Sequence, residues 1–243
     1  MQLQHNHRWN VTTAEARAIQ TELAARVIRH KPAAFAPRLI AGVDVGFENA
    51  GTLTRAAIVV LELETLLPVD CVIARRPTQF PYVPGLLSFR EIPAVLDALE
   101  RLEQWPDVLL CDGQGIAHPR RLGIASHLGV LTGLPSAGIA KSLLVGSHGA
   151  VPEAAGEWTA LCDGDEQIGA VLRNRAGCKP VYVSIGHRLD LDTAIALVRR
   201  CTTQYRLPET TRWADGVASR KLPVLRRLPE ALRQRLPPAP APA

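Results

Sequence analysis

The sequence predicts one α/β domain in which helices flank a mixed central sheet. Residues 38–48, 55–64 and 67–76 are largely apolar and have the length of strands. Only turn residues separate them, so we expect an antiparallel meander. Helical patterns then alternate with further short apolar segments. Hydrophobic residues make up 47% of the 243 residues, which is enough for a buried core.

Local signals place the remaining elements. Thr12-x-x-Glu15 is a capping box, and it opens an amphipathic helix that ends at basic residues near position 31. A second helix follows a Pro-rich loop and runs to about Gln104. We also expect strands at 107–113 and 135–141, helices at 120–133 and 191–205, and a hairpin formed by 167–174 and 180–186.

No internal repeat and no linker interrupts residues 12–220. We therefore assign residues 12–222 to a single catalytic domain and residues 1–11 to an N-terminal extension. The chain ends in "LPPAPAPA", which has no means of packing. Residues 223–243 are accordingly expected to be a disordered, Pro-rich tail.

Composition narrows the class of protein. No apolar run approaches the ~20 residues of a membrane span, and the first ten residues lack the apolar core of a signal peptide, so we expect a cytoplasmic protein. Five cysteines without a C-x-x-C pair predict free thiols in a reducing compartment. The net charge of +5 fits a polyanionic partner but is also common in proteins that bind none.

Two aspartates end apolar segments and stand beside glycine. Asp44 closes "LIAGV" and Asp112 closes "VLLC". Ligand sites of α/β sheets lie beyond strand ends, so the two carboxylates are expected to face one cleft. Oxygen ligands of this kind suit Mg²⁺ or Mn²⁺. Asp70 also precedes an apolar strand but lacks a neighbouring glycine, and we expect it to be solvated.

Glu91 is the third candidate carboxylate, and two interpretations remain open for it. Ser88-x-x-Glu91 has the pattern of a capping box, in which Glu91 would only support a helix. If the helix instead starts at Pro93, Glu91 lies outside it and is free to bind a ligand. Three crowded acids without a paired base favour a cation between them.

Basic residues follow the acidic positions. His118, Arg120 and Arg121 lie in "AHPRRLG", where cations at a helix start would oppose the helix dipole, so phosphate binding is favoured. Lys141 follows the strand "AGIA". A solvated lysine is the ordinary interpretation, but beside carboxylates it would stabilise charge on a phosphoryl transition state.

Six segments together resemble the endonuclease V family of deoxyinosine-specific DNA repair nucleases. These segments are "IAGVDVGFE", "PYVPGLLSFRE", "DGQGIAHPRRLGIASHLG", "GIAKSLL", "GHRLDLDTA" and "LPETTRWAD". The resemblance extends from the first helix to about residue 221. It implies a ribonuclease H-like fold, with an acidic cluster at the centre of the sheet, and favours a monomer.

The resemblance also implies roles for individual residues. Asp44 and Asp112 match the metal-binding aspartates of the family, and Glu91 matches its third acidic residue. Basic residues that help to place the scissile phosphate are matched by Lys141 and His118. Two further positions match residues near the family's site with less defined roles: His187 and Asp215.

In this family, the loop "PYVP" is a wedge. Tyr82, between Pro81 and Pro84, would insert into the duplex and fill the gap left by an extruded base, replacing stacking worth roughly 1–3 kcal/mol. The extruded hypoxanthine would enter a pocket read largely by backbone groups near Gly85, Leu87, Gly113 and Gly123. Gln114 stands where the family often has histidine, which puts any protonic role there in doubt.

The implied activity is Mg²⁺-dependent hydrolysis of the second phosphodiester bond 3′ to a deaminated base, with Mn²⁺ as a substitute. The products would carry a 3′-hydroxyl and a 5′-phosphate. Alternatives are a ribonuclease for inosine-containing RNA and a nucleic-acid binder that has lost catalysis. An actin-like ATPase, which also opens with "GVDVG", would need a second phosphate loop and a longer chain, and we reject it.

Overall fold

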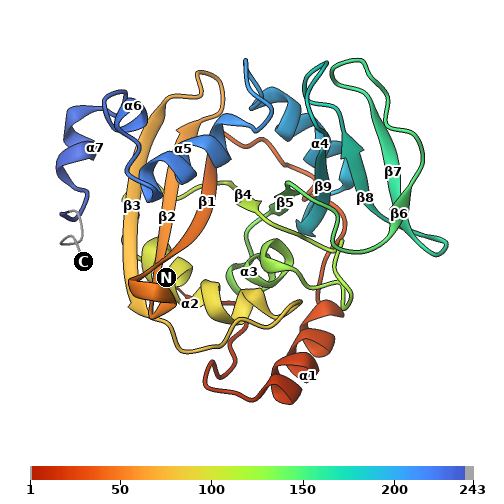
Figure 1. Ribbon diagram of the computed structural model, residues 1–243, viewed down its shortest axis with the longest axis horizontal. Coiled ribbons are helices and arrows are strands. Elements are labelled where there is room, and N and C mark those ends of the chain that lie inside the picture. Colours follow the sequence, from red (N-terminus) through yellow and green to blue (C-terminus); the bar gives the residue numbers. More distant parts are fainter. Residues whose placement is uncertain (1, 239–243) are drawn as a thin grey trace.

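A nine-stranded sheet forms the centre of the protein (Figure 1). The computed structural model describes residues 2–238. In chain order the strands are β1 (Leu39–Glu48), β2 (Leu53–Glu62), β3 (Pro68–Pro77), β4 (Val108–Asp112), β5 (Ser136–Ala140), β6 (Ser147–His148), β7 (Trp158–Asp163), β8 (Glu166–Leu172) and β9 (Val181–His187). Their spatial order is β3-β2-β1-β4-β5-β9-β8-β7-β6.

Helices cover both faces of the sheet. They are α1 (Thr13–Ala24), α2 (Leu87–Leu99), α3 (Ile124–Thr132), α4 (Leu191–Arg200), α5 (Glu209–Ala218), α6 (Leu222–Leu225) and α7 (Glu230–Gln234). The capping box predicted for α1 is present, and α3 ends at Gly133 with a φ of 75°. Within residues 2–238, no helix is both long and apolar enough to cross a membrane.

The strand pairing confirms the predicted meander. β1 pairs antiparallel with β2 and β2 with β3, whereas β1, β4 and β5 run parallel. The hairpin of β8 and β9 is also present. The sequence did not reveal β6, β7 or α5, because β7 is mostly half-exposed and α5 is rich in threonine and contains a glycine, which weakens its helical pattern.

Two apolar layers hold the sheet between its helices. Alternate side chains of each strand point to opposite faces, so Ile40 and Leu110 pack with α4 and α5 while Val43 and Leu109 pack with α2 and α3. In Figure 1, α5 crosses β1 and β2 on one face, and α2 and α3 lie behind the sheet. The central strands are consequently buried on both faces.

The C-terminal segment is not the disordered tail that we predicted, up to the last described residue. Residues 222–234 contain α6 and α7, and Leu228 and Leu232 are buried in the main core. The prediction of a solvated Asp70 is wrong for a related reason: its side chain is fully buried and lies 3.0 Å from Arg235, just beyond α7. Residues 239–243 lie outside the described part of the chain.

The start of α2 also differs from both interpretations. The helix begins at Leu87 and continues through Pro93, so Glu91 lies inside it. Ser88 does not cap the helix, because its hydroxyl bonds to Nδ1 of His127 on α3 at 3.0 Å. Pro93 cannot donate to the carbonyl of Phe89, and the helix tolerates this loss while it is packed deep against β2 and β3.

Candidate active site

Asp44 and Asp112 stand side by side at the ends of neighbouring parallel strands. Val43 of β1 is paired with Cys111 of β4, so the aspartate that follows each of them is at the same level of the sheet. Both side chains point to the face covered by α5, because they continue the alternation of Ile40 and Leu110. The two aspartates therefore lie at neighbouring strand ends and on the same face of the sheet.

Asp215 approaches the two aspartates from α5. Gly42 allows the helix to approach, since a Cβ at this position would lie 2.0 Å from the carbonyl oxygen of Thr210. The charge of Asp215 raises the pKa of Asp44, so the two groups interact. Asp215 also forms an ion pair with Lys221, which lies just after α5.

Glu91 approaches Asp44 and Asp112 from α2, which covers the opposite face of the sheet to α5. These three acids and Asp215 are called the acidic group. Burial, together with the charges of Asp44 and Asp112, raises the pKa of Glu91 to about 8. Burial and the charges of Asp112 and Asp215 likewise raise the pKa of Asp44 to about 7. The acids are thus close enough to oppose each other's ionisation.

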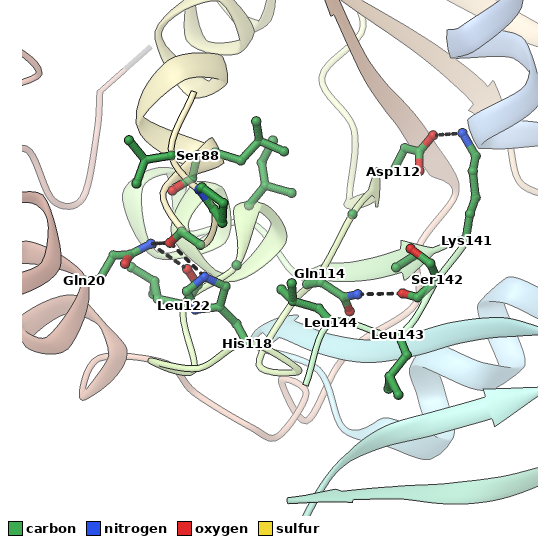
Figure 2. A pocket seen from close by; sticks show the side chains of 18 of the residues that line it. Gln20, Ser88, Asp112, Gln114, His118, Leu122, Lys141, Ser142, Leu143 and Leu144 are labelled. Carbon is green, nitrogen blue, oxygen red and sulfur yellow. Dashed lines mark hydrogen bonds and ion pairs between the residues drawn. The ribbon is translucent and has the colours of Figure 1, made fainter. Parts of the chain in front are cut away.

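Lys141 brings a positive charge to these acids. It follows β5, and its Nζ bonds to Oδ2 of Asp112 (Figure 2). Burial lowers the pKa of Lys141, but the bond to Asp112 and the charges of Asp44 and Asp215 outweigh this effect and raise it overall. Lys141 therefore remains protonated beside the carboxylates.

The residues present fit a divalent cation. Glu91 is buried and Asp44 is half-buried. Nearby cations offset their repulsion only in part, and no described group donates a hydrogen bond to either carboxyl. Hard oxygen donors in this condition are the ligands that Mg²⁺ or Mn²⁺ prefers. Within residues 2–238, no three His, Cys, Asp or Glu side chains already form a compact metal cluster, so binding would need side-chain adjustment.

A pocket of about 410 Å³ opens beside Asp112 and Lys141. Its walls come from the loop before α2, the loop between β4 and α3, and the segment after β5 (Figure 2). All four residues predicted for a base pocket line it, namely Gly85, Leu87, Gly113 and Gly123. Tyr82 lines its edge and is 70% exposed.

Comparison with known proteins defines the relationship of the chain. The sequence model of the endonuclease V family matches residues 21–216. The chain belongs to the endonuclease V family. Endonuclease V of Trichormus variabilis is 57% identical over 221 residues, which are 91% of this chain and 100% of that protein.

Solved endonuclease V structures have the same ribonuclease H-like fold. The crystal structure from Streptomyces avermitilis matches with a TM-score of 0.83 at 47% identity and covers 88% of this chain and 95% of its own. Ciona intestinalis endonuclease V, in complex with a 24mer DNA containing an inosine followed by a ribo-adenosine, matches with a TM-score of 0.75 at 29% identity. That comparison covers 86% of this chain and 97% of the Ciona chain.

An aromatic cluster supports the wedge loop expected of an endonuclease V. Phe80, Leu86 and Phe89, which come before and after Tyr82 in the chain, form a small core against which Val83 packs. Trp9 and His7, from the N-terminal extension, pack against Phe89 with ring centroids 5.9 and 5.3 Å away. The extension is thereby part of the platform that carries the exposed tyrosine.

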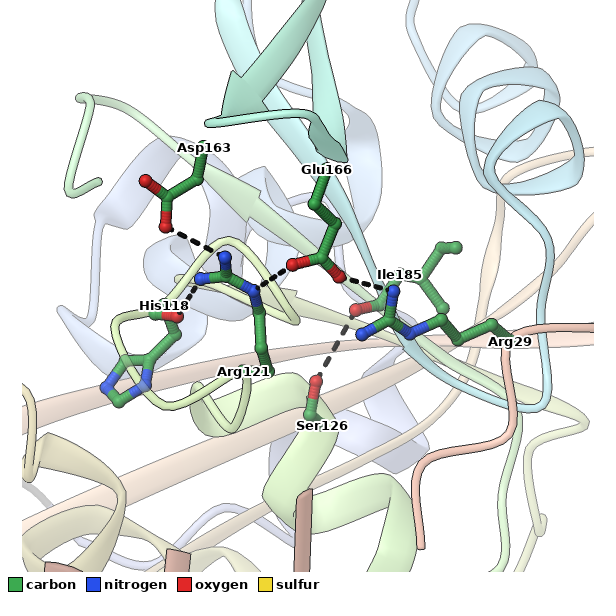
Figure 3. Close-up of polar contacts among 7 residues, drawn as sticks. All are labelled: Arg29, His118, Arg121, Ser126, Asp163, Glu166 and Ile185. Atoms are coloured by element: carbon green, nitrogen blue, oxygen red, sulfur yellow. Dashed lines mark hydrogen bonds and ion pairs between the residues drawn. The ribbon is translucent and has the colours of Figure 1, made fainter. Parts of the chain in front are cut away.

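His118 and Arg121 have different environments from the phosphate-binding positions that the sequence led us to expect. His118 is buried and bonds to the carbonyl of Gly85 at 3.0 Å, and burial lowers its pKa to about 4. Arg121 donates to Asp163 at 2.8 Å and to Glu166 at 2.7 Å (Figure 3). Neither side chain offers a free positive charge to a phosphate, so we correct both assignments to internal supports.

His187 does not lie near the acidic group. It is paired with Ser136 at the beginning of β5, whereas Lys141 follows the end of that strand. Its Nδ1 accepts a hydrogen bond from the backbone N–H of Ile28 at 3.3 Å. The structure thus places His187 at the end of β5 away from Lys141, where its side chain holds the segment after α1.

Sequence reasoning missed Gln20, which lines the pocket and is only 1% exposed. Its position was recoverable in principle, because Ala16, Gln20 and Leu23 share one helical stripe and a glutamine on an apolar stripe needs partners. Gln114 also lines the pocket, and its Nε2 donates to the carbonyl of Ser142 at 3.2 Å. That bond ties two pocket walls together.

Proposed function

We propose that the protein is a Mg²⁺-dependent DNA repair endonuclease that recognises deoxyinosine and hydrolyses the second phosphodiester bond on its 3′ side. Mn²⁺ is expected to substitute, and the products carry a 3′-hydroxyl and a 5′-phosphate. The observation that supports this most strongly is the continuity of the pocket with Asp112 and Lys141. The part of the pocket lined by the glycines can hold a base, while the part beside Asp112 and Lys141 can hold a phosphate.

Asp44, Glu91 and Asp112 would hold the cation in this proposal. A bound divalent ion supplies Lewis-acid stabilisation of negative charge on the phosphate. Lys141 contributes a fixed positive charge at the same place, because its pKa is raised and it is already oriented by Asp112. Asp215 strengthens the negative field that attracts the cation.

The pocket has a size and lining suited to a single extruded base. Its volume lies within the range of about 300–1,000 Å³ typical of small-ligand sites. Gly85, Gly113 and Gly123 expose backbone rather than side chain to an occupant. The Ciona relative was crystallised with DNA that contains inosine, the nucleoside of hypoxanthine.

Tyr82 is the wedge in this proposal, and its ring should matter more than its hydroxyl. Tyr82→Ala should weaken binding to a deoxyinosine duplex by roughly 5- to 150-fold, since stacking is worth about 1–3 kcal/mol per base. The cleavage rate at saturating protein should change less. Tyr82→Phe is the matched control and should bind nearly as the wild type does, which fluorescence anisotropy with EDTA present would measure.

The direct test is cleavage of an end-labelled duplex that carries one deoxyinosine, with Mg²⁺ or with EDTA. We expect a nick at the second bond 3′ to the lesion in Mg²⁺, none in EDTA, and none in an otherwise identical undamaged duplex. Cleavage at the same rate in EDTA would exclude the metal assignment. Tight binding without any nick would indicate a binding protein that has lost catalysis.

A ribonuclease acting on inosine-containing RNA is the second candidate. One observation favours it: in the Ciona complexes a ribo-adenosine follows the inosine, so a 2′-hydroxyl is present next to the base in that relative. Competition between matched DNA and RNA strands of one sequence would decide between them. Preferential loss of the RNA strand would replace our first proposal by this one.

A further inference from the structure

The carbonyl oxygen of Gly85 receives hydrogen bonds from three side chains. Nε2 of Gln20 donates at 3.0 Å, Nε2 of His118 at 3.0 Å and Nη2 of Arg120 at 2.7 Å. Two of the donors are joined to each other, because Nε of Arg120 donates to Oε1 of Gln20 at 2.5 Å. The group, which we call the Gly85 clamp, links α1 and the loop before α3 to the wedge loop.

The hydrogen-bond pattern fixes the state of His118 in the clamp. Its Nδ1 accepts from the backbone N–H of Arg120 at 3.2 Å, so the proton must reside on Nε2, which then donates to Gly85. The ring is neutral, and its burial favours that form. The clamp is therefore intact at neutral pH without any further proton uptake.

The clamp holds one peptide group at both ends. The bond between Gly85 and Leu86 has its oxygen in the clamp, and its N–H donates to the carbonyl of Val83 at 2.9 Å. On either side of this peptide, the N–H groups of Gly85 and Leu87 donate no hydrogen bond within the described part of the chain. Both residues line the pocket. Fixing the central peptide thus restricts the backbone on either side of it, where two N–H donors are unused.

Glycine is required at position 85 for the same arrangement. Its φ is 76°, a conformation that side chains disfavour. A Cβ there would also lie 3.0 Å from Nη2 of Arg120 and 3.6 Å from Nε2 of His118. The backbone comes into reach of three donors only because no side chain is present.

We infer that Gln20 and Arg120 are positioning residues for base recognition, acting through the Gly85 clamp to hold two backbone N–H donors toward the acceptor atoms of the extruded base. This inference rests on the proposed function. It also replaces our expectation that Arg120 contacts DNA: two of its guanidinium nitrogens are already bonded to Gln20 and Gly85. A base with an amino group at the same place would put a hydrogen-bond donor against the two N–H donors. Such a base would be rejected.

Two variants remove the clamp and one matched control spares it. Arg120→Gln shortens the side chain and removes its charge, and Gln20→Met removes the amide with little change of size. Arg17→Gln removes an equal charge at an exposed position of α1 near Arg120, without any clamp contact. Arg120→Lys keeps the charge of Arg120 but loses the planar fork that reaches Gln20 and Gly85 together.

The decisive quantity is the ratio of two dissociation constants, measured with EDTA present. One duplex carries deoxyinosine, and the other carries a tetrahydrofuran abasic analogue at the same position. We expect Arg120→Gln and Gln20→Met to weaken deoxyinosine binding about tenfold and abasic binding less than about twofold. Arg120→Lys should resemble Arg120→Gln, and Arg17→Gln should leave the ratio unchanged.

A phosphate contact by Arg120 would give the opposite pattern. Both duplexes would lose affinity equally, Arg120→Lys would restore it, and the slope of log K against log salt would fall by about one unit. That result would overturn the inference. If the wild type binds deoxyinosine no better than the abasic analogue, the proposed function fails instead.

Amide hydrogen exchange at Leu86 tests the clamp independently of any substrate. The clamp predicts faster exchange of this N–H in Arg120→Gln and Gln20→Met than in the wild type or Arg17→Gln. Unchanged exchange in both clamp variants would contradict the inference even in a protein that cleaves deoxyinosine normally.

Discussion

Asp44 and Asp70 lie in the same half of the sheet, Asp44 half-buried and Asp70 fully buried, and their surroundings differ. Oδ2 of Asp70 accepts the backbone N–H groups of Glu103 and Gln104 at 2.7 and 2.9 Å. Its Oδ1 lies 3.0 Å from Nη1 of Arg235, close enough for an ion pair although not aligned for a hydrogen bond. Among residues 2–238 no group donates a hydrogen bond to Asp44, and burial and neighbouring carboxyls raise its pKa to about 7.

The difference shows which property of a buried acid indicates function. Burial alone does not, because Asp70 is the more deeply buried of the two and serves to join β3 to the C-terminal segment. A carboxylate whose charge is compensated inside the chain has a structural role, because its removal leaves the buried partner uncompensated. A carboxylate that lies among other carboxylates weakens the fold by repulsion. Such an arrangement is typical of a functional site, where a bound cation supplies the compensating positive charge.

Replacing each aspartate by asparagine should separate the two roles. The largest effect is expected for Asp44→Asn, which should reduce cleavage of the deoxyinosine duplex more than about a hundredfold, because it removes a charge from the cation site. The protein should remain folded by circular dichroism. Normal cleavage by this variant would mean that Asp44 holds no catalytic cation.

Asp70→Asn should do the reverse. Losing the charge leaves Arg235 without its buried partner, which we expect to destabilise the fold by about 2 kcal/mol, since Arg235 is partly solvated. For a chain of this size the melting temperature would fall by about 4–8 °C. Calorimetry would measure it, and cleavage at 25 °C should stay within about twofold of the wild type. Equal stability of variant and wild type would show that the ion pair contributes nothing.

The pH dependence of stability should distinguish the two aspartates more finely. The pKa values of Asp44 and Glu91 are raised to about 7 and about 8, so above the unfolded pKa near 4 the folded state binds more protons than the unfolded state. Stability without metal must then fall as pH rises from about 5 to 8. Asp44→Asn should flatten this fall by about 2–3 kcal/mol in urea titrations. An identical slope in the variant would refute the shifted pKa.

Sequence patterns predicted the parts of the site that depend on strand ends. Asp44 and Asp112 follow apolar runs and precede glycine, and parallel pairing of β1 with β4 brings them to one level. The approximate limits of β1, β2 and β3 followed from their apolar length. These features are local or depend on a single pairing, so a sequence displays them directly.

Features that depend on distant partners were predicted less well. Whether His118 is charged depends on the carbonyl of Gly85, and whether Asp70 is solvated depends on Arg235, more than 160 positions later. The local cue of Pro93 suggested a helix start, but packing against β2 and β3 overrode it. His187 matched a family motif, yet only the register of β5 and β9 shows that it lies at the end of these strands away from Lys141.

Thermal unfolding of the wild type and Asp44→Asn at pH 8, without DNA and with or without millimolar Mg²⁺ or Mn²⁺, tests most directly whether the acidic group is a cation site. We predict that the wild type gains several degrees on metal addition, because binding to the folded state relieves the repulsion. Asp44→Asn should melt higher than the wild type without metal and gain less from it. A wild type that responds to neither ion, together with a variant that is no more stable, would contradict this account.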